Sequence, residues 1–308
     1  MRSRPRVPAA LTLLLAAACG GDTSGSLPRE FDGAAALKSV ETQVAFGPRI
    51  PGTAGHAAMA RWLDSLVRTK TDSVVVQRWW HHPAEGDSLE MINVIARVNP
   101  AATNRVLYLA HWDTRPRSDG PTSIDKVAPV PGANDGGSGV AVLLGVLDAL
   151  KKLPTTVGVD LVFLDGEDYG FFGPPRVDVL IGAEYYAKNP IPAEKPSFAV
   201  LWDMVGDKDL RIPKEPGSQV AAPDVVDRVW TVAARMGYGH LFVDAPYNGP
   251  ITDDHTPLIA AGFKAIDIID IDYGSWHTKH DTPDKLSKSS LEAVGNVAVG
   301  VIRGATAK

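Results

Sequence analysis

Short apolar segments of strand-forming residues alternate along this chain with segments patterned as amphipathic helices. Their length and their β-branched content predict buried strands. The expected strands are at 106–110, 159–164, 198–202 and 265–269. The expected helices are at 138–150, 183–188, 223–236, 255–261 and 290–303. Because such alternation places helices on both faces of a sheet, it predicts a three-layer α/β/α sandwich with a central mixed, mostly parallel sheet.

The first third of the chain adds two helices and a pair of strands. Helices are expected at 34–46 and 54–68, and strands at 74–79 and 92–97. Consecutive strands without a helix between them indicate an antiparallel edge, which makes the sheet mixed. We find no internal repeat and no linker, so residues 31–308 are expected to form one domain.

The N-terminal residues have the pattern of an export signal. Three arginines precede the short apolar segment 11–15, and three alanines then lead to Cys19. This resembles a bacterial lipoprotein signal at 1–18, in which Cys19 becomes the lipid-modified first residue. A plain signal peptide with an incidental cysteine is the alternative. Residues 19–30 are expected to be a flexible tether, and the protein to be exported and lipid-anchored at the bacterial cell envelope, in the periplasm or on the outer-membrane face.

Composition excludes several classes of partner and chemistry. Cys19 is the only cysteine, so neither a disulfide framework nor a cysteine nucleophile is available. Without the three arginines of the signal, 28 basic side chains face 36 acidic ones, and the net charge changes from −5 to −8. This acidic balance argues against a nucleic-acid partner. Beyond the N-terminal signal, no segment is long and apolar enough to span a bilayer, so membrane contact is expected only through the lipid anchor.

Carboxylates and histidines stand directly after the predicted strands or open the helices that follow them. They are His111, Asp113, Asp135, Glu167, Asp168, Asp203, Asp254 and His277. In an open α/β sheet, the carboxyl ends of the strands are where ligands bind. Imidazole and carboxylate ligands together suit zinc. The adjacent Glu167 and Asp168 point to different sides, so one could hold a metal while the other moves a proton.

Five segments, in order along the chain, resemble a known family. They are FGPRIPGTAGH at 46–56, GANDGGSGVA at 132–141, LDGEDYG at 164–170, LWDMVG at 201–206 and WHTKHDTPDKL at 276–286. They are similar to the zinc exopeptidases of metallopeptidase family 28, over roughly residues 40 to 290. The resemblance implies a zinc-exopeptidase-like catalytic domain whose substrates are peptide or protein N-termini. The family holds two chemistries, those of di-zinc aminopeptidases and of single-zinc glutaminyl cyclases.

The resemblance also implies roles for individual residues. Asp135, Asp168 and His277 would hold the principal zinc. Glu167 would be the general acid/base, and Asp203 would belong to the acidic network that supports it. The family usually has glutamate where Asp168 stands, and the shorter aspartate requires that strand end to lie closer to the metal.

Four further residues take implied roles. Asp254 would complete the supporting acidic network. His111, together with Asp203, would hold a second zinc in the aminopeptidases, and Asp113 would orient His111. Trp276, directly before His277, would form a wall of the substrate pocket.

The same motifs favour the glutaminyl cyclase branch. An insertion at 169–181 follows the acidic pair, and the triplet at 253–255 reads Asp-Asp-His. Trp276 and the segment AHWDTRP at 110–116 also resemble the cyclases. We therefore expect a glutaminyl-peptide cyclotransferase that uses one zinc ion. The alternative is an aminopeptidase with two zinc ions, because every position for a second one is present. A non-catalytic peptide-binding lipoprotein is the third interpretation, and the oligomeric state is not indicated.

Other polar residues have simpler interpretations. His255 opens a helix and is expected to cap it or to hydrogen-bond. His280 is expected to be solvated, and Asp165 to shape the turn before Glu167. Asp267, Asp270 and Asp272 alternate with isoleucine, which is typical of a solvated strand face or strand end.

Overall fold

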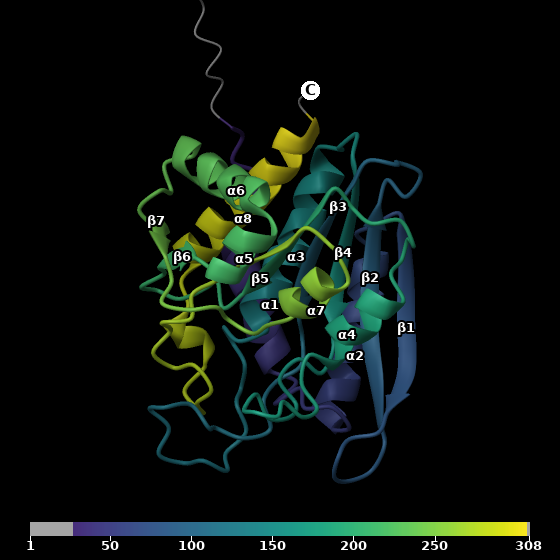
Figure 1. Cartoon of the computed structure of the whole chain (residues 1–308), viewed down its shortest axis with the longest axis vertical. Helices are drawn as coiled ribbons and strands as arrows, with labels where there is room; N and C mark the ends of the chain where they lie inside the picture. The colour runs from purple at the N-terminus through teal and green to yellow at the C-terminus, as the bar shows by residue number, and fades with distance from the viewer. Residues whose placement is uncertain (1–26, 307–308) are drawn as a thin grey trace, which may run out of the picture.

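The computed structural model describes residues 27–306 (Figure 1). The expected signal at 1–18, the lipidation residue Cys19 and most of the expected tether lie outside the described residues. Within them, Arg29 donates to the carbonyl of Met236 at 2.9 Å, and Glu30 pairs with Arg303. Leu27 also packs against the larger apolar core, so contacts with the folded domain begin before the expected boundary at residue 31.

A central sheet of six strands runs through the domain in the order β1-β2-β4-β3-β5-β8. Its strands are β1 (Ser73–His81), β2 (Leu89–Val98), β3 (Arg105–His111), β4 (Gly158–Leu164), β5 (Phe198–Asp203) and β8 (Ala265–Ile269). The last four are mutually parallel, whereas β2 runs antiparallel to both β1 and β4. The predicted mixed, mostly parallel sheet with an antiparallel edge is confirmed.

Helices cover both faces of this sheet. They are α1 (Gly33–Val44), α2 (Ala54–Arg68), α3 (Gly137–Lys152), α4 (Ile181–Lys188), α5 (Pro216–Ala221), α6 (Pro223–Arg235), α7 (His255–Ala260) and α8 (Lys288–Thr306). Residues of α1, α2, α3, α6 and α8 share the larger apolar core, and residues of α4 and α7 share a smaller one (Figure 1). The three-layer architecture is confirmed.

Strand β4 shows why the strands are apolar without alternation. Val159, Leu161 and Phe163 point into the larger core, whereas Val162 and Leu164 point into the smaller one. Successive side chains of a strand face opposite sides, and here both sides are covered by helices. Apart from Asp160, which pairs with Arg105, the positions from Val159 to Leu164 are therefore apolar.

Short elements after β5 were not predicted. Strands β6 (Ile212–Lys214) and β7 (Phe242–Pro246) form a separate parallel pair, α5 lies next to β8, and a 3₁₀ turn covers Pro283–Lys285. The two strands are too short to show a period. Asp267 and Asp270 are buried, so the prediction that they lie on a solvated strand face is wrong, although Asp272 is exposed.

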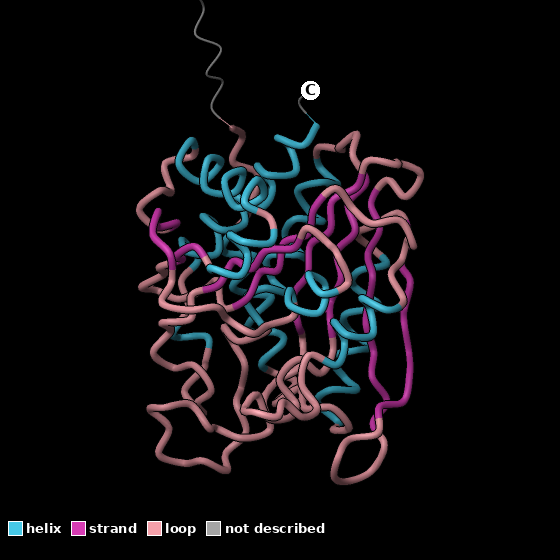
Figure 2. Tube along the Cα trace, in the orientation of Figure 1, coloured by secondary structure: helices cyan, strands magenta, loops and turns pink. Residues whose placement is uncertain are grey.

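The parallel strands deliver their carboxyl ends to one end of the molecule. Long loops gather there, at the bottom of the view in Figure 2. The described chain begins and ends at the opposite end, where α8 finishes (Figure 1). None of the described helices is long and apolar enough to cross a membrane.

Candidate metal centre

Two groups of three ligand-type side chains meet at the carboxyl ends of the strands. Asp135, Asp168 and His277 form the first, and His111, Asp135 and Asp203 form the second. Within each group the ligand atoms lie within 4.8 Å of one another, and all the residues are buried. The sequence-predicted ligands therefore do come together, with Asp135 shared between the two groups.

Buried polar atoms without partners show that these groups fit a cation. His111 Nε2, Asp135 Oδ2 and Asp168 Oδ2 are buried and have no hydrogen-bond partner. A buried unpaired polar atom costs about 1–3 kcal/mol, so such atoms indicate a missing ligand. Carboxylate oxygens with an imidazole nitrogen are the donor set that zinc takes. The donor chemistry therefore fits zinc.

Asp135 lies in the turn at the end of the long loop between β3 and α3. Gly136, the residue before α3, has φ of +76°, and a Cβ added to it would lie 2.9 Å from His111 Cε1. Glycine is required at this position both by the left-handed backbone and by the close approach of the imidazole. The glycine-rich sequence thus lets the loop pack directly against His111.

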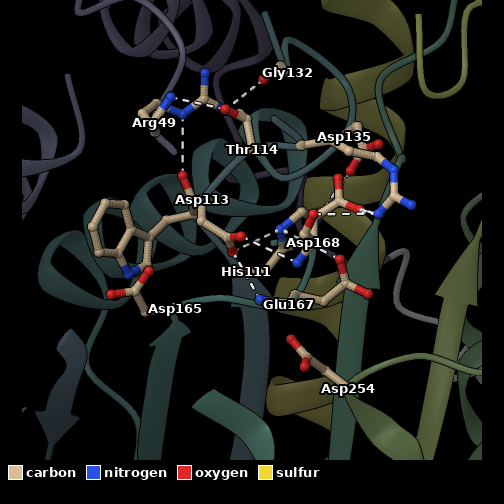
Figure 3. A network of polar contacts seen from close by, with 12 residues as sticks. Arg49, His111, Asp113, Thr114, Gly132, Asp135, Asp165, Glu167, Asp168 and Asp254 are labelled. Carbon is tan, nitrogen blue, oxygen red and sulfur yellow. Dashed lines mark hydrogen bonds and ion pairs between the residues drawn. The ribbon is translucent and has the colours of Figure 1, made fainter. Parts of the chain in front are cut away.

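Two buried charged residues that sequence reasoning missed hold this loop. The guanidinium of Arg49 donates to the carbonyls of Trp112, Pro131 and Gly132 at 2.6–3.1 Å (Figure 3). The carboxylate of Asp281 accepts the backbone N–H groups of Asn134 and Asp135 at 2.9 and 3.1 Å. Both residues stand inside motifs quoted above, but their spacing gives no sign of these partners.

The acidic pair follows a turn at the end of β4, and Asp113 holds that turn. The two carboxylate oxygens of Asp113 accept the backbone N–H groups of Glu167 and Asp168 at 3.0 and 3.1 Å. One oxygen also lies 3.4 Å from His111 Nδ1, consistent with the expected orienting role. Asp113 thus contacts three residues of the site at once (Figure 3).

Glu167 and Asp168 differ in electrostatic environment. Burial raises the pKa of Glu167 well above its ordinary value, and the charge of Asp168 adds to the effect. Burial alone would also raise the pKa of Asp168, but His277 and Arg115 outweigh it and lower that pKa to about 2. One member of the pair therefore stays anionic while the other can carry a proton.

Further acids surround Glu167. Asp253 and Asp254 are buried and their charges also raise the pKa of Glu167. Neither oxygen of Asp254 has a hydrogen-bond partner, and its carboxylate faces Glu167 (Figure 3). His255 lies 3.5 Å from Glu215 and 3.7 Å from Asp267, outside both ligand groups. Of these, sequence reasoning gave no role to Asp253.

A cavity of about 380 Å³ opens beside the acidic pair. Its walls combine acids with apolar side chains, and they include Glu167, Asp203, Asp253, His277, Met204, Ile251, Ile269, Phe171, Phe172 and Trp276. Trp276 lies in the wall, as expected, and the two phenylalanines come from the loop after the acidic pair. Glu167 lines the cavity together with the proposed ligands Asp135 and His277, whereas Asp168 does not.

Comparison with known proteins shows which family and which proteins this chain resembles. The model of peptidase family M28 matches residues 93–302. The glutaminyl-peptide cyclotransferase of Drosophila melanogaster is 24% identical over 271 residues, covering 80% of this chain and 73% of that protein.

Two solved structures cover nearly the whole domain. The glutaminyl cyclase of Porphyromonas gingivalis is 38% identical with a TM-score of 0.85, covering 90% of this chain and 99% of that one. A leucine aminopeptidase precursor from Bacteroides thetaiotaomicron is 35% identical with a TM-score of 0.85, covering 90% and 98%. Together with the buried ligand groups at the strand ends, these matches show that the chain belongs to peptidase family M28.

Proposed function

We propose that this protein is a zinc-dependent glutaminyl-peptide cyclotransferase, which converts an N-terminal glutamine to pyroglutamate and releases ammonia. The observation that carries the proposal is the placement of Glu167. Its carboxyl group, with a raised pKa, lines a cavity that Phe171, Phe172 and Trp276 also line, next to the first ligand group. A small, largely apolar pocket with one protonatable acid suits a single N-terminal residue.

Asp135, Asp168 and His277 would hold one zinc ion. When bound, zinc supplies a Lewis acid that polarises the carbonyl of the substrate's side-chain amide. Asp203 and Asp254 would support Glu167 through their charges. A second zinc ion at His111 and Asp203, sharing Asp135, belongs to the alternative function.

Glu167 would move the proton of the reaction. The α-amine of the substrate attacks its own side-chain amide carbon, and a new C–N bond closes a five-membered ring. Glu167 takes the proton that the amine loses and returns it to the departing nitrogen, which leaves as ammonia when the old C–N bond breaks. A carboxyl group with a raised pKa is suited to both transfers. The cavity walls hold the amine and the amide in reach of each other.

An aminopeptidase that uses two zinc ions is the second candidate. The complete second ligand group favours it, as does the similarity to a leucine aminopeptidase precursor. The remaining alternative, a non-catalytic peptide-binding lipoprotein, would be expected to lack an acid or a ligand. All the implied residues are in place, which argues against it.

Metal content and two substrates separate these candidates. Ammonia release from a Gln-peptide by protein holding one zinc ion is the expected result. Hydrolysis of an amino-acid anilide by protein holding two would replace the proposal with the aminopeptidase. Glu167→Gln should lower turnover by roughly 10²–10⁴-fold with zinc still bound. Asp168→Asn is the matched control, and it should lose zinc instead. Zinc loss in the Glu167 variant would contradict the division of roles.

The proposed location is the cell envelope, with the lipid on Cys19. The described chain starts at the end of the molecule opposite the strand ends that carry the site (Figure 1). An anchor at that end would let the cavity face away from the membrane, toward soluble N-termini. Metabolic labelling with a palmitate analogue should mark the protein, and Cys19→Ser should abolish the label.

A further inference from the structure

Arg115 and Asp119 join two of the proposed zinc ligands, which come from distant parts of the chain. Arg115 Nη1 donates to Asp168 Oδ1 at 2.7 Å. Its Nε and Nη2 donate to the two oxygens of Asp119 at 2.6 Å each. Asp119 Oδ1 in turn lies 3.0 Å from His277 Nδ1. A continuous line of contacts thus runs from one ligand to the other through this pair.

The backbone next to Asp119 also holds His277. The N–H of Gly120 donates to the carbonyl of His277 at 3.0 Å. A Cβ on Gly120 would lie 2.2 Å from the carbonyl oxygen of Trp276, so only glycine permits this approach. His277 itself has φ of +53°, a left-handed conformation that costs of order 1–3 kcal/mol and persists only when its surroundings enforce it. Residues 119 and 120 provide such surroundings.

We propose that residues 115–120 are a positioning element of the zinc site, which orders Asp168 and His277 before the metal binds. The inference rests on the proposed zinc ligands but not on which reaction they serve. Asp119 accepts a hydrogen bond from the Nδ1–H group of His277, which directs Nε2 toward a metal. The hydrogen bond from Arg115 fixes the direction of the Asp168 carboxylate.

The geometry requires arginine rather than any cation. Only 3% of the Arg115 side chain is exposed, and its planar fork bonds both oxygens of Asp119 while the third nitrogen reaches Asp168. A lysine ammonium is a single point of charge and cannot reproduce a bidentate contact. Arg115→Lys therefore preserves the charge and removes the geometry, which separates positioning from simple neutralisation.

Zinc affinity of the full chain tests the proposal, measured by competition with a chromogenic chelator. Arg115→Lys and Asp119→Asn should each weaken binding by roughly 10–100-fold, the usual effect of removing a group that orients a ligand. The visible absorption of the Co²⁺-loaded protein should also change in both variants. Asp119 is partly exposed, so its variant is expected to keep the thermal midpoint of the metal-free protein.

Arg105→Lys is the matched control. Arg105 donates to both oxygens of Asp160, with both distances 2.6 Å, as Arg115 does to Asp119. Arg105 and Asp160 lie near the starts of β3 and β4, at the opposite end of these strands from the proposed zinc site. This variant should lower the thermal midpoint without changing zinc affinity.

Three results would overturn the proposal. One is unchanged zinc affinity in both Arg115→Lys and Asp119→Asn. Another is an equal loss of affinity in Arg105→Lys, which would make the effect one of general stability. The third is wild-type affinity in His277→Ala, which would remove the proposed zinc site as well. In the first two cases the proposed function stands.

Discussion

Replacing Asp165 with asparagine tests how the turn that presents the acidic pair is held. Asp165 is fully buried at the end of β4. Both of its oxygens lie 2.9 Å from Nε2 of His56, and Oδ2 also accepts the N–H of Ile92 at 2.7 Å. Burial raises the pKa of Asp165 to about 6 despite the opposing effect of His56. The His56 ring also stacks on Trp112, with centroids 4.5 Å apart.

The expected cost follows from this burial. Removing one partner of a buried ion pair costs about 3–5 kcal/mol, because the other is left without compensation. Asparagine can still accept the N–H of Ile92 through its carbonyl oxygen, which places Asp165→Asn near 3 kcal/mol. For a domain of this size, about 2 °C of thermal midpoint corresponds to 1 kcal/mol, so the midpoint should fall by about 6 °C.

A double-mutant cycle provides the assay and the refutation. Urea unfolding of the metal-free protein would be measured for Asp165→Asn, for His56→Gln and for both together. The pair should show a coupling free energy of about 1–3 kcal/mol, the range for residues in one polar network. Additive single effects, within about 0.5 kcal/mol, would show that the contact does not hold the turn.

Two further predictions concern buried acids outside the ligand groups. Asp281→Ala leaves the N–H groups of Asn134 and Asp135 unpaired, which costs about 1–3 kcal/mol each, and should lower both stability and zinc affinity. Tyr273→Phe is the milder companion variant: it removes one hydrogen bond to Asp281 and should cost about 1 kcal/mol of stability. Burial raises the pKa of Asp270 to about 7. The pKa of Asp270 in the folded protein thus exceeds its pKa in the unfolded chain. Its contribution to stability is therefore fully present below about pH 4 and is lost as pH rises to 7. The free energy of unfolding should therefore fall by up to about 4 kcal/mol between pH 4 and pH 8 because of Asp270. Asp270→Asn should remove this fall, as measured by urea unfolding at the two pH values.

The parts of the fold that the sequence predicts are those with a strong local pattern. The strand at 265–269 and the helix at 54–68 were predicted with the bounds that the structure has. Both carry an apolar pattern and both end at residues that break it. The gathering of ligand-type side chains at one end of the molecule was also predictable, because parallel strands bring their carboxyl ends to one edge of the sheet. The family resemblance, and not this geometry, gave the ligand set of Asp135, Asp168 and His277, and loops carry two of these residues there.

The residues that hold the ligands were not predictable in the same way. Arg49, Arg115, Asp119 and Asp281 act on partners far away in the sequence, and no spacing rule connects them. An alternation of polar and apolar residues is also a poor guide to exposure in a strand that helices cover on both faces. Asp267 has the spacing of a solvated position, yet it is buried, and its N–H donates to a hydroxyl on α5.

The apolar lining of the cavity favours cyclisation over hydrolysis even though both ligand groups are complete. A hydrolase must bring water to the carbonyl carbon, whereas in cyclisation the attacking group is the substrate's own amine and water is a competitor. Phe171, Phe172 and Trp276 put apolar surface around Glu167, and Arg115 lies 5.6 Å from the centre of the Phe172 ring. Apolar walls exclude water and strengthen the charges inside. The loop after the acidic pair, which supplies Phe171 and Phe172, therefore favours cyclisation, because the acids and the ligand groups serve either reaction.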